Sequence, residues 1–147
     1  MKRFSFGLKS VLNHRNYLEK KAQRGLFNAG KEYMGRKRTV EELGRKKAVS
    51  VRKCSAERYR GIDVSRYQLY ISFLEKLNVD IERAYTSLEE GAVSVKMHED
   101  ALRKALIRKK TLETLKEVQY KRYVKRAARE DQKVLDEMAI IREWRKQ

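Results

Sequence analysis

The chain has 147 residues, of which 37 are lysine or arginine and 20 are aspartate or glutamate, so its formal net charge is +17. Charged residues make up 39% of the chain, against about 25% in ordinary globular domains. This composition argues against a compact enzyme with a deep pocket. It also predicts no membrane span, because the longest stretch without a polar residue, 138–141, falls far short of the roughly 20 apolar residues required.

The compartment can be predicted from the cysteine content and the N-terminal residues. Cys54 is the single cysteine and cannot form an internal disulfide, which fits a reducing compartment. Lys9, His14 and Arg15 interrupt the apolar region that a secretory signal would need. We therefore expect a cytosolic protein.

The first predicted element is a helix over about residues 5–57. The chain has no proline, and its apolar residues recur every three or four positions, which is the spacing of a helix face. Four glycines, each about 1 kcal/mol less favourable than alanine, are expected on the surface of this weaker helix. The stripe comprises Val11, Leu18, Ala22, Leu26, Ala29, Tyr33, Val40, Leu43 and Val51, and the glycines are Gly25, Gly30, Gly35 and Gly44.

Basic residues interrupt this apolar stripe at Arg15, Arg36 and Lys47. A stripe this thin favours a seam of two helices, from which the long basic side chains turn outward to water.

A turn is predicted at about residues 58–65, followed by a second helix over about 66–144. Ser65 and Gln68 have the spacing of a capping box, which predicts a helix start. The apolar stripe of the second helix is the most regular in the sequence, and after Leu115 it shifts by about one position. It comprises Leu74, Leu77, Ile81, Ala84, Leu88, Val95, Leu102, Ala105 and Leu112, and then Tyr120, Val124, Ala127, Val134, Met138 and Ile141.

The predicted fold class is all-α: two long helices that form an antiparallel coiled-coil hairpin, as a single domain over residues 1–147. With the turn centred near Gly61, a residue i should face position 122 minus i. The second helix is then too long for its partner, and residues from about 115 to 147 should overhang with an uncovered apolar stripe. Such a stripe is typical of a docking element.

The positive charge is concentrated in the first helix. Residues 1–60 carry 18 basic and 5 acidic side chains, whereas residues 61–147 carry 19 and 15. Such a field could meet phosphates, acidic lipids or an acidic protein surface. The tyrosines lie on or beside the predicted seam, so no module for reading nucleic-acid bases is visible.

Catalytic and metal-binding patterns are not found in the sequence. His14, His98 and Cys54 have no companions at metal-ligand spacing. Adjacent carboxylates diverge on a helix, and no Gly-rich phosphate loop occurs. We expect no enzymatic activity, no metal and no cofactor.

Both ends of the chain carry a recognisable pattern. The start, Phe4-Ser5-Phe6-Gly7-Leu8-Lys9-Ser10-Val11-Leu12-Asn13-His14-Arg15, resembles the F-x-F-x-L-x-x-V-L-x-x-R pattern of the flagellar export protein FliJ family. The segment Asp131-Gln132-Lys133-Val134-Leu135-Asp136-Glu137-Met138-Ala139 resembles the family's C-terminal segment. Length and lack of proline also agree over essentially the whole chain.

This resemblance implies a non-enzymatic, stalk-like component of the bacterial flagellar type III export apparatus. Its implied partners are the export ATPase hexamer, the cytoplasmic domain of the membrane export gate and export chaperones. Its implied location is the cytoplasmic side of the cell membrane at the flagellar base, with at most peripheral membrane contact. The candidate partner-binding tip comprises the matching residues Phe4, Phe6, Leu8, Asp131, Gln132, Asp136 and Glu137, with Val134, Met138 and Ile141 of the overhanging stripe.

Two alternatives remain open at this point. The net charge of +17 also fits a basic coiled coil that binds nucleic acid or ribosomes, although the seam tyrosines argue against it. The equivalent stalk of a virulence type III secretion system would have the same pattern. The chain is also more basic than we expect of the family, which leaves room for contact with anionic lipid at the export gate.

Overall fold

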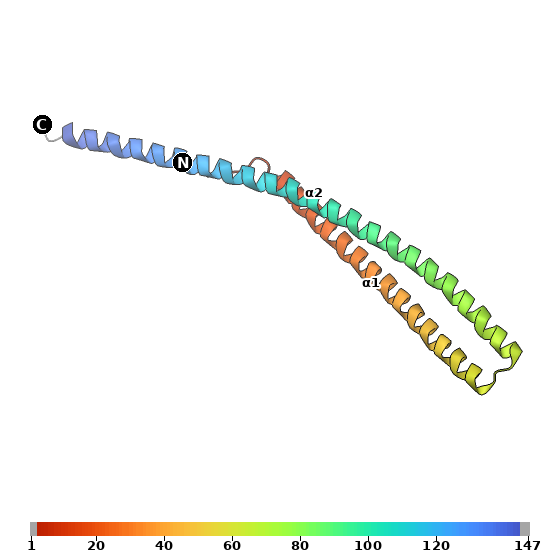
Figure 1. Ribbon diagram of the computed structural model, residues 1–147. Coiled ribbons are helices and arrows are strands. Elements are labelled where there is room, and N and C mark those ends of the chain that lie inside the picture. The colour runs from red at the N-terminus through yellow and green to blue at the C-terminus, as the bar shows by residue number, and fades with distance from the viewer. Residues whose placement is uncertain (1–2, 145–147) are drawn as a thin grey trace. The chain divides into compact units, whose positions relative to one another are not determined.

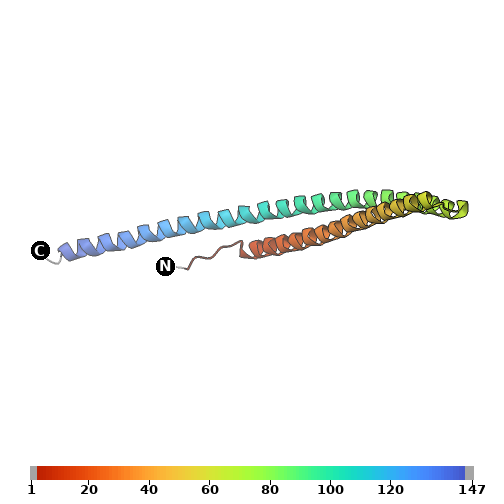
Figure 2. The same ribbon diagram turned by 60° about the horizontal axis from the view of Figure 1, so that its bottom comes forward.

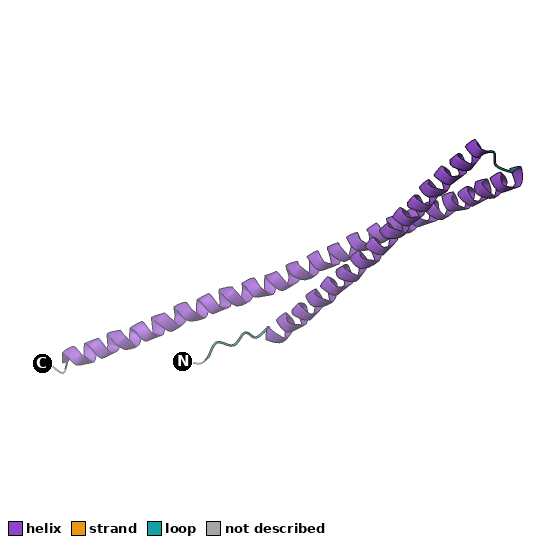
Figure 3. Ribbon diagram, turned by 90° about the horizontal axis from the view of Figure 1, so that it is seen from below, coloured by secondary structure: helices purple, strands orange, loops and turns teal. Residues whose placement is uncertain are grey.

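The computed structural model describes residues 3–144, with the side chain of Glu143 excepted. Two helices account for most of this range, α1 (Lys9–Arg60) and α2 (Val64–Trp144), and the described residues contain no strand (Figure 3). The all-α class and the two long helices that pack against each other are therefore confirmed. The first helix begins four residues later and ends three residues later than predicted, and the second begins two residues earlier.

The connection between the helices is shorter than predicted because the second helix has a different N-cap. Gly61 has a φ of 85°, a left-handed conformation that glycine adopts without strain. The backbone N–H of Tyr67 donates to the carbonyl oxygen of Asp63 at 2.9 Å, so Asp63 occupies the N-cap position. Ser65 lies inside the helix, and the predicted capping box from Ser65 to Gln68 is therefore wrong.

The chain divides into two compact units, which we describe separately: residues 21–102, and residues 1–20 with 103–147. In the unit of residues 21–102, the later part of α1 and the first part of α2 lie side by side in opposite directions (Figures 1 and 2). Gly25 faces His98, and Arg36 bonds to Ser87. The numbers in both pairs add up to 123, against the predicted 122.

The seam of this unit follows the predicted stripes closely. Leu77 and Ala29 are buried at 5% exposure, and the other predicted positions of α2 in this unit are half-buried. Val51 was predicted on the α1 stripe but is exposed, and Cys54 is buried in its place. The seam keeps the coiled-coil spacing of three and four, so its next positions after Lys47 are Ser50 and Cys54, and Val51 lies outside it.

One glycine of α1 belongs to the seam, contrary to the prediction. A Cβ atom on Gly25 would lie 2.8 Å from Cδ2 of His98, so the absence of a side chain makes room for the imidazole. The Nδ1 atom of that ring lies 2.8 Å from the carbonyl oxygen of Ser94, which holds the ring in place. The prediction of surface positions fits Gly35 and Gly44, which are exposed and where a Cβ atom would meet nothing within 4 Å, whereas Gly30 is half-buried.

Arg36 also differs from the prediction, because its side chain does not turn away from the partner helix. Its Nη1 atom donates to the carbonyl oxygen of Ser87 at 2.6 Å and lies 3.8 Å from Oε2 of Glu90. A Cβ atom on Gly91 would lie 3.2 Å from Cδ of Arg36. The buried Gly91 thus provides the space through which arginine reaches the backbone of α2.

In the second unit, the start of α1 packs against the later part of α2. Glu19 is buried, and Nζ of Lys109 donates to its Oε2 at 2.8 Å. This hydrogen bond raises the pKa of Lys109 above its ordinary value of 10.5, against the opposing effect of desolvation. On the predicted stripe of α1, Val11 is exposed and the half-buried Leu12 replaces it.

Candidate partner-binding site

The candidate residues near the N-terminus pack against α2 before the helix α1 begins. The Phe6 side chain is buried at 7% exposure, and Leu8 remains partly exposed. The ring of Phe4 lies 5.3 Å from that of Tyr120 and 5.6 Å from that of Tyr123, measured between centroids. Phe4 therefore anchors the N-terminal segment to α2 within this unit.

The candidate residues near the C-terminus lie on α2 beyond this aromatic cluster. From residue 128 to residue 142, every residue is exposed. The predicted Asp131, Gln132, Asp136 and Glu137 are all exposed and helical. The structure thus brings Phe4 together with Tyr120 and Tyr123, buries Phe6 and leaves these four polar residues to solvent.

The apolar residues of the same stretch form the C-terminal arm, which we define as residues 128–144. Val134, Met138 and Ile141 have four-three spacing and lie along one face, and Met138 is 62% exposed. Ile140 and Trp144 lie four residues apart on another face, and Trp144 is 80% exposed. An apolar arm of this kind is typical of a segment that becomes buried against a partner.

A second apolar surface lies at the start of α2, and the sequence reasoning missed it. The turn-end patch consists of Val64, Leu69 and Phe73, and Leu69 is 71% exposed. A cavity of about 300 Å³ is lined by Leu69 and Phe73 together with Arg66 and Tyr70. The signal that could have found it is the apolar residues that fall off the seam of Leu74 and Leu77.

Polar contacts hold in place two residues that line the cavity of the turn-end patch, Arg66 and Tyr70. Glu57 of α1 accepts a hydrogen bond from Oη of Tyr70 at 2.9 Å. It also forms an ion pair with Arg66, whose Nε lies 3.1 Å from Oε2. The hydrogen bond to Glu57 raises the pKa of Tyr70 above 10.0. These bonds hold Arg66 and Tyr70 beside Leu69, so the patch is presented on an ordered surface.

The residues considered for metal chemistry have structural surroundings. His14 stacks on Tyr17 at 6.5 Å between ring centroids, and Cys54 is buried in the seam. Among residues 3–144, no group of three or more His, Cys, Asp or Glu side chains has the geometry to hold a metal ion. Within the same range, neither helix contains a window apolar enough for a membrane span.

These features define an all-α, two-helix coiled-coil protein with exposed apolar surfaces. The model of the family described as flagellar FliJ protein matches residues 4–147, so the chain belongs to the FliJ family. It is therefore a component of the type III protein export apparatus, in a family that is non-enzymatic.

A solved structure has the same fold. It is that of CT670 from Chlamydia trachomatis, described as a proposed YscO homolog, with 15% sequence identity and a TM-score of 0.53. The match covers 95% of this chain and 94% of that chain, and at this identity it shows the fold alone. None of the curated proteins matches the chain significantly.

Proposed function

We propose that this protein is a stalk-like adaptor that binds the flagellar export ATPase hexamer and promotes its assembly and activity. In this role it links the hexamer to the cytoplasmic domain of the export gate and escorts export chaperones. It acts on the cytoplasmic side of the cell membrane, at the flagellar base. The proposal follows from membership of the FliJ family.

One observation carries the contact with the ATPase: the C-terminal arm exposes apolar side chains on more than one face. Val134, Met138 and Ile141 lie on one side of the helix, and Ile140 and Trp144 lie on another. Apolar side chains on two sides of a helix are removed from water only when a partner covers both sides. The central hole of a ring of subunits can cover more than one side of a helix, whereas a flat surface covers only one side.

The variant Val134→Asp with Met138→Asp tests this contact. Each aspartate places a charge where the ring would desolvate it, so we expect the double variant to lose stimulation of ATP hydrolysis. Both side chains are exposed in the isolated protein, so the helix content should not change. The measurements are ATP hydrolysis by the export ATPase with and without the adaptor, and far-ultraviolet circular dichroism.

The matched control is Ala128→Asp with Ala139→Asp, which adds the same charge on a different side of the arm. This control should retain most of the stimulation. Full stimulation by the Val134 and Met138 variant, or equal loss in both variants, would contradict a role for the apolar face.

We assign the contact with the export gate to the turn-end patch. Val64, Leu69 and Phe73 are exposed, and they belong to a different unit from the C-terminal arm. The two surfaces share no residue, so one molecule has separate side chains for each partner. This arrangement is what an adaptor that links two partners requires.

A further inference from the structure

The face of α1 that points away from the seam carries a second pattern with coiled-coil spacing. Its positions alternate at intervals of three and four, as on the buried seam. All of them are exposed, and they lie within the unit of residues 21–102. We call this set the outer seam: the basic residues Arg24, Lys31, Arg38, Arg45 and Arg52, which are seven apart, and between them Phe27, Met34, Glu41 and Ala48.

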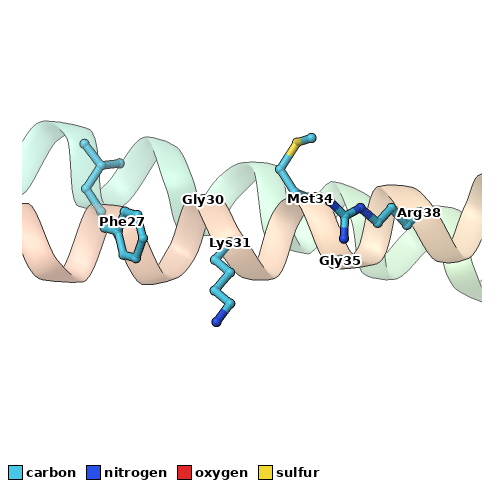
Figure 4. A pocket seen from close by; sticks show the side chains of 7 residues that line it. Phe27, Gly30, Lys31, Met34, Gly35 and Arg38 are labelled. Atoms are coloured by element: carbon cyan, nitrogen blue, oxygen red, sulfur yellow. The ribbon is translucent and has the colours of Figure 1, made fainter.

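A groove lies on the first half of the outer seam. It has a volume of about 730 Å³, and Phe27, Gly30, Met34 and Arg38 are among its lining residues. Figure 4 shows the side chains of Phe27, Lys31 and Met34 projecting from the helix around Gly30. The Phe27 side chain is 72% exposed, so the groove presents apolar surface between basic groups.

We propose that the outer seam binds an acidic amphipathic helix of a partner protein. The seam with α2 keeps α1 near 3.5 residues per turn, so these exposed positions also stay on one line along the helix, where a further helix could lie against them. From Arg24 to Arg52, that line is about 42 Å long at 1.5 Å per residue. The outer seam therefore has the length and the spacing of a coiled-coil interface with no second helix against it in the described chain.

The charge of the outer seam selects the chemistry of this partner helix. Within residues 3–144, the side chains of Arg24, Lys31, Arg38, Arg45 and Arg52 form no hydrogen bond or ion pair. Glu41 is the one acidic residue among the nine positions of the outer seam. Glutamates or aspartates facing the basic positions would neutralise this charge, while leucine-like side chains would cover Phe27 and Met34.

Nucleic acid is the competing ligand for a row of basic residues, and the outer seam fits it less well. Single-stranded nucleic acid prefers aromatic platforms on which bases stack, and Phe27 is the one aromatic residue of the row. Duplex DNA would meet the basic side chains through its phosphates, and the apolar Met34 in the groove would contribute little to such binding. This surface is distinct from the C-terminal arm and the turn-end patch, so the inference stands apart from the proposed function.

The full-length protein can be tested with a synthetic four-heptad peptide that has glutamate and leucine at alternate core positions. Its binding is measured by fluorescence anisotropy at physiological salt, beside a scrambled peptide of identical composition and a fluorescent DNA duplex. We expect the patterned peptide to bind at least about tenfold more tightly than the scrambled one, because only its charges and leucines match the seam. Equal binding of both peptides, or tighter binding of the duplex, would overturn the proposal.

The variant Lys31→Glu with Arg38→Glu locates the site. We expect it to weaken binding of the patterned peptide by about tenfold or more, since two attractive pairs become repulsive. Lys76→Glu with Lys96→Glu makes the same change of charge on exposed positions of α2 and should have a much smaller effect. Equal weakening by both variants would show that only net charge attracts the peptide, and circular dichroism verifies that both variants remain helical.

Discussion

Single residues that are not apolar set the pairing of the two helices. Gly91 and Lys109 occupy positions of α2 at which the heptad spacing calls for an apolar side chain. Each is matched by a particular residue of α1: Arg36 packs over Gly91, and Glu19 bonds to Lys109. A buried polar group without a partner would be costly, so such pairs favour one alignment over its neighbours.

At Gly25 and Gly44, the same substitution should have opposite effects on stability. Gly44→Ala should raise the free energy of unfolding by about 1 kcal/mol, because alanine favours the helix and its Cβ atom meets nothing within 4 Å. Gly25→Ala should lower the free energy of unfolding, because its Cβ atom would lie 2.8 Å from Cδ2 of His98. Urea unfolding followed by circular dichroism measures both. Stabilisation of equal size in the two variants would show that His98 does not pack on Gly25.

The pair of Lys109 with Glu19 should make stability depend on alkaline pH. The folded-state pKa of Lys109 is raised above 10.5, so its contribution is complete below pH 10.5 and is lost as pH rises through the folded pKa. Lys109→Arg keeps the charge at these pH values and should show a smaller fall in melting temperature above pH 10.5 than the wild type. The control is Lys104→Arg, an exposed position that should behave like the wild type. The same fall in all three proteins would contradict this role of the pair.

At the scale of the helices, apolar periodicity predicted which residues are buried more accurately than capping signals predicted where the helices begin. The apolar stripe of α2 was correct at every position from Leu74 to Leu112, because burial in a two-helix seam requires that spacing. The helix start at Val64 was missed because Ser65 offered a plausible cap beside the actual one, Asp63. Pairs such as Gly25 with His98 could not be predicted, because a shift of one residue in alignment exchanges the partners.

The exposure of the C-terminal arm predicts that its removal should not destabilise the rest of the chain. A variant that ends at Ala127 lacks only residues beyond the aromatic contacts of Phe4 with Tyr120 and Tyr123. We expect its melting temperature to change by no more than a few degrees, while stimulation of the ATPase is lost. A large fall in melting temperature would show that the arm is buried in the isolated protein.

At the scale of the molecule, two separate apolar surfaces fit a protein that holds two partners. The C-terminal arm and the turn-end patch belong to different compact units, and each consists of exposed side chains on α2. The exposed apolar residues of the C-terminal arm could be predicted from the sequence because the stripe runs past the end of the shorter helix. The turn-end patch was missed because Leu69 and Phe73 lie off the seam repeat, which was the pattern used to select residues.

Substitutions in the two surfaces should therefore separate two activities. Leu69→Asp with Phe73→Asp should abolish binding to the cytoplasmic domain of the export gate and leave ATPase stimulation intact. Val134→Asp with Met138→Asp should do the reverse. Pull-down with the gate domain and ATP hydrolysis assays measure the two activities. If either double variant loses both activities while remaining helical, the surfaces are not independent.

The salt bridge between Lys109 and Glu19 restricts how the helices of its unit can move. If α2 slid along α1 by two turns in either direction, Lys109 would meet Leu12 or Leu26, and its hydrogen bond to Glu19 would be lost. Helix sliding, which transmits signals in some coiled coils, is therefore costly here. We therefore expect a force applied by a partner to one helix of this unit to be carried by both of its helices together.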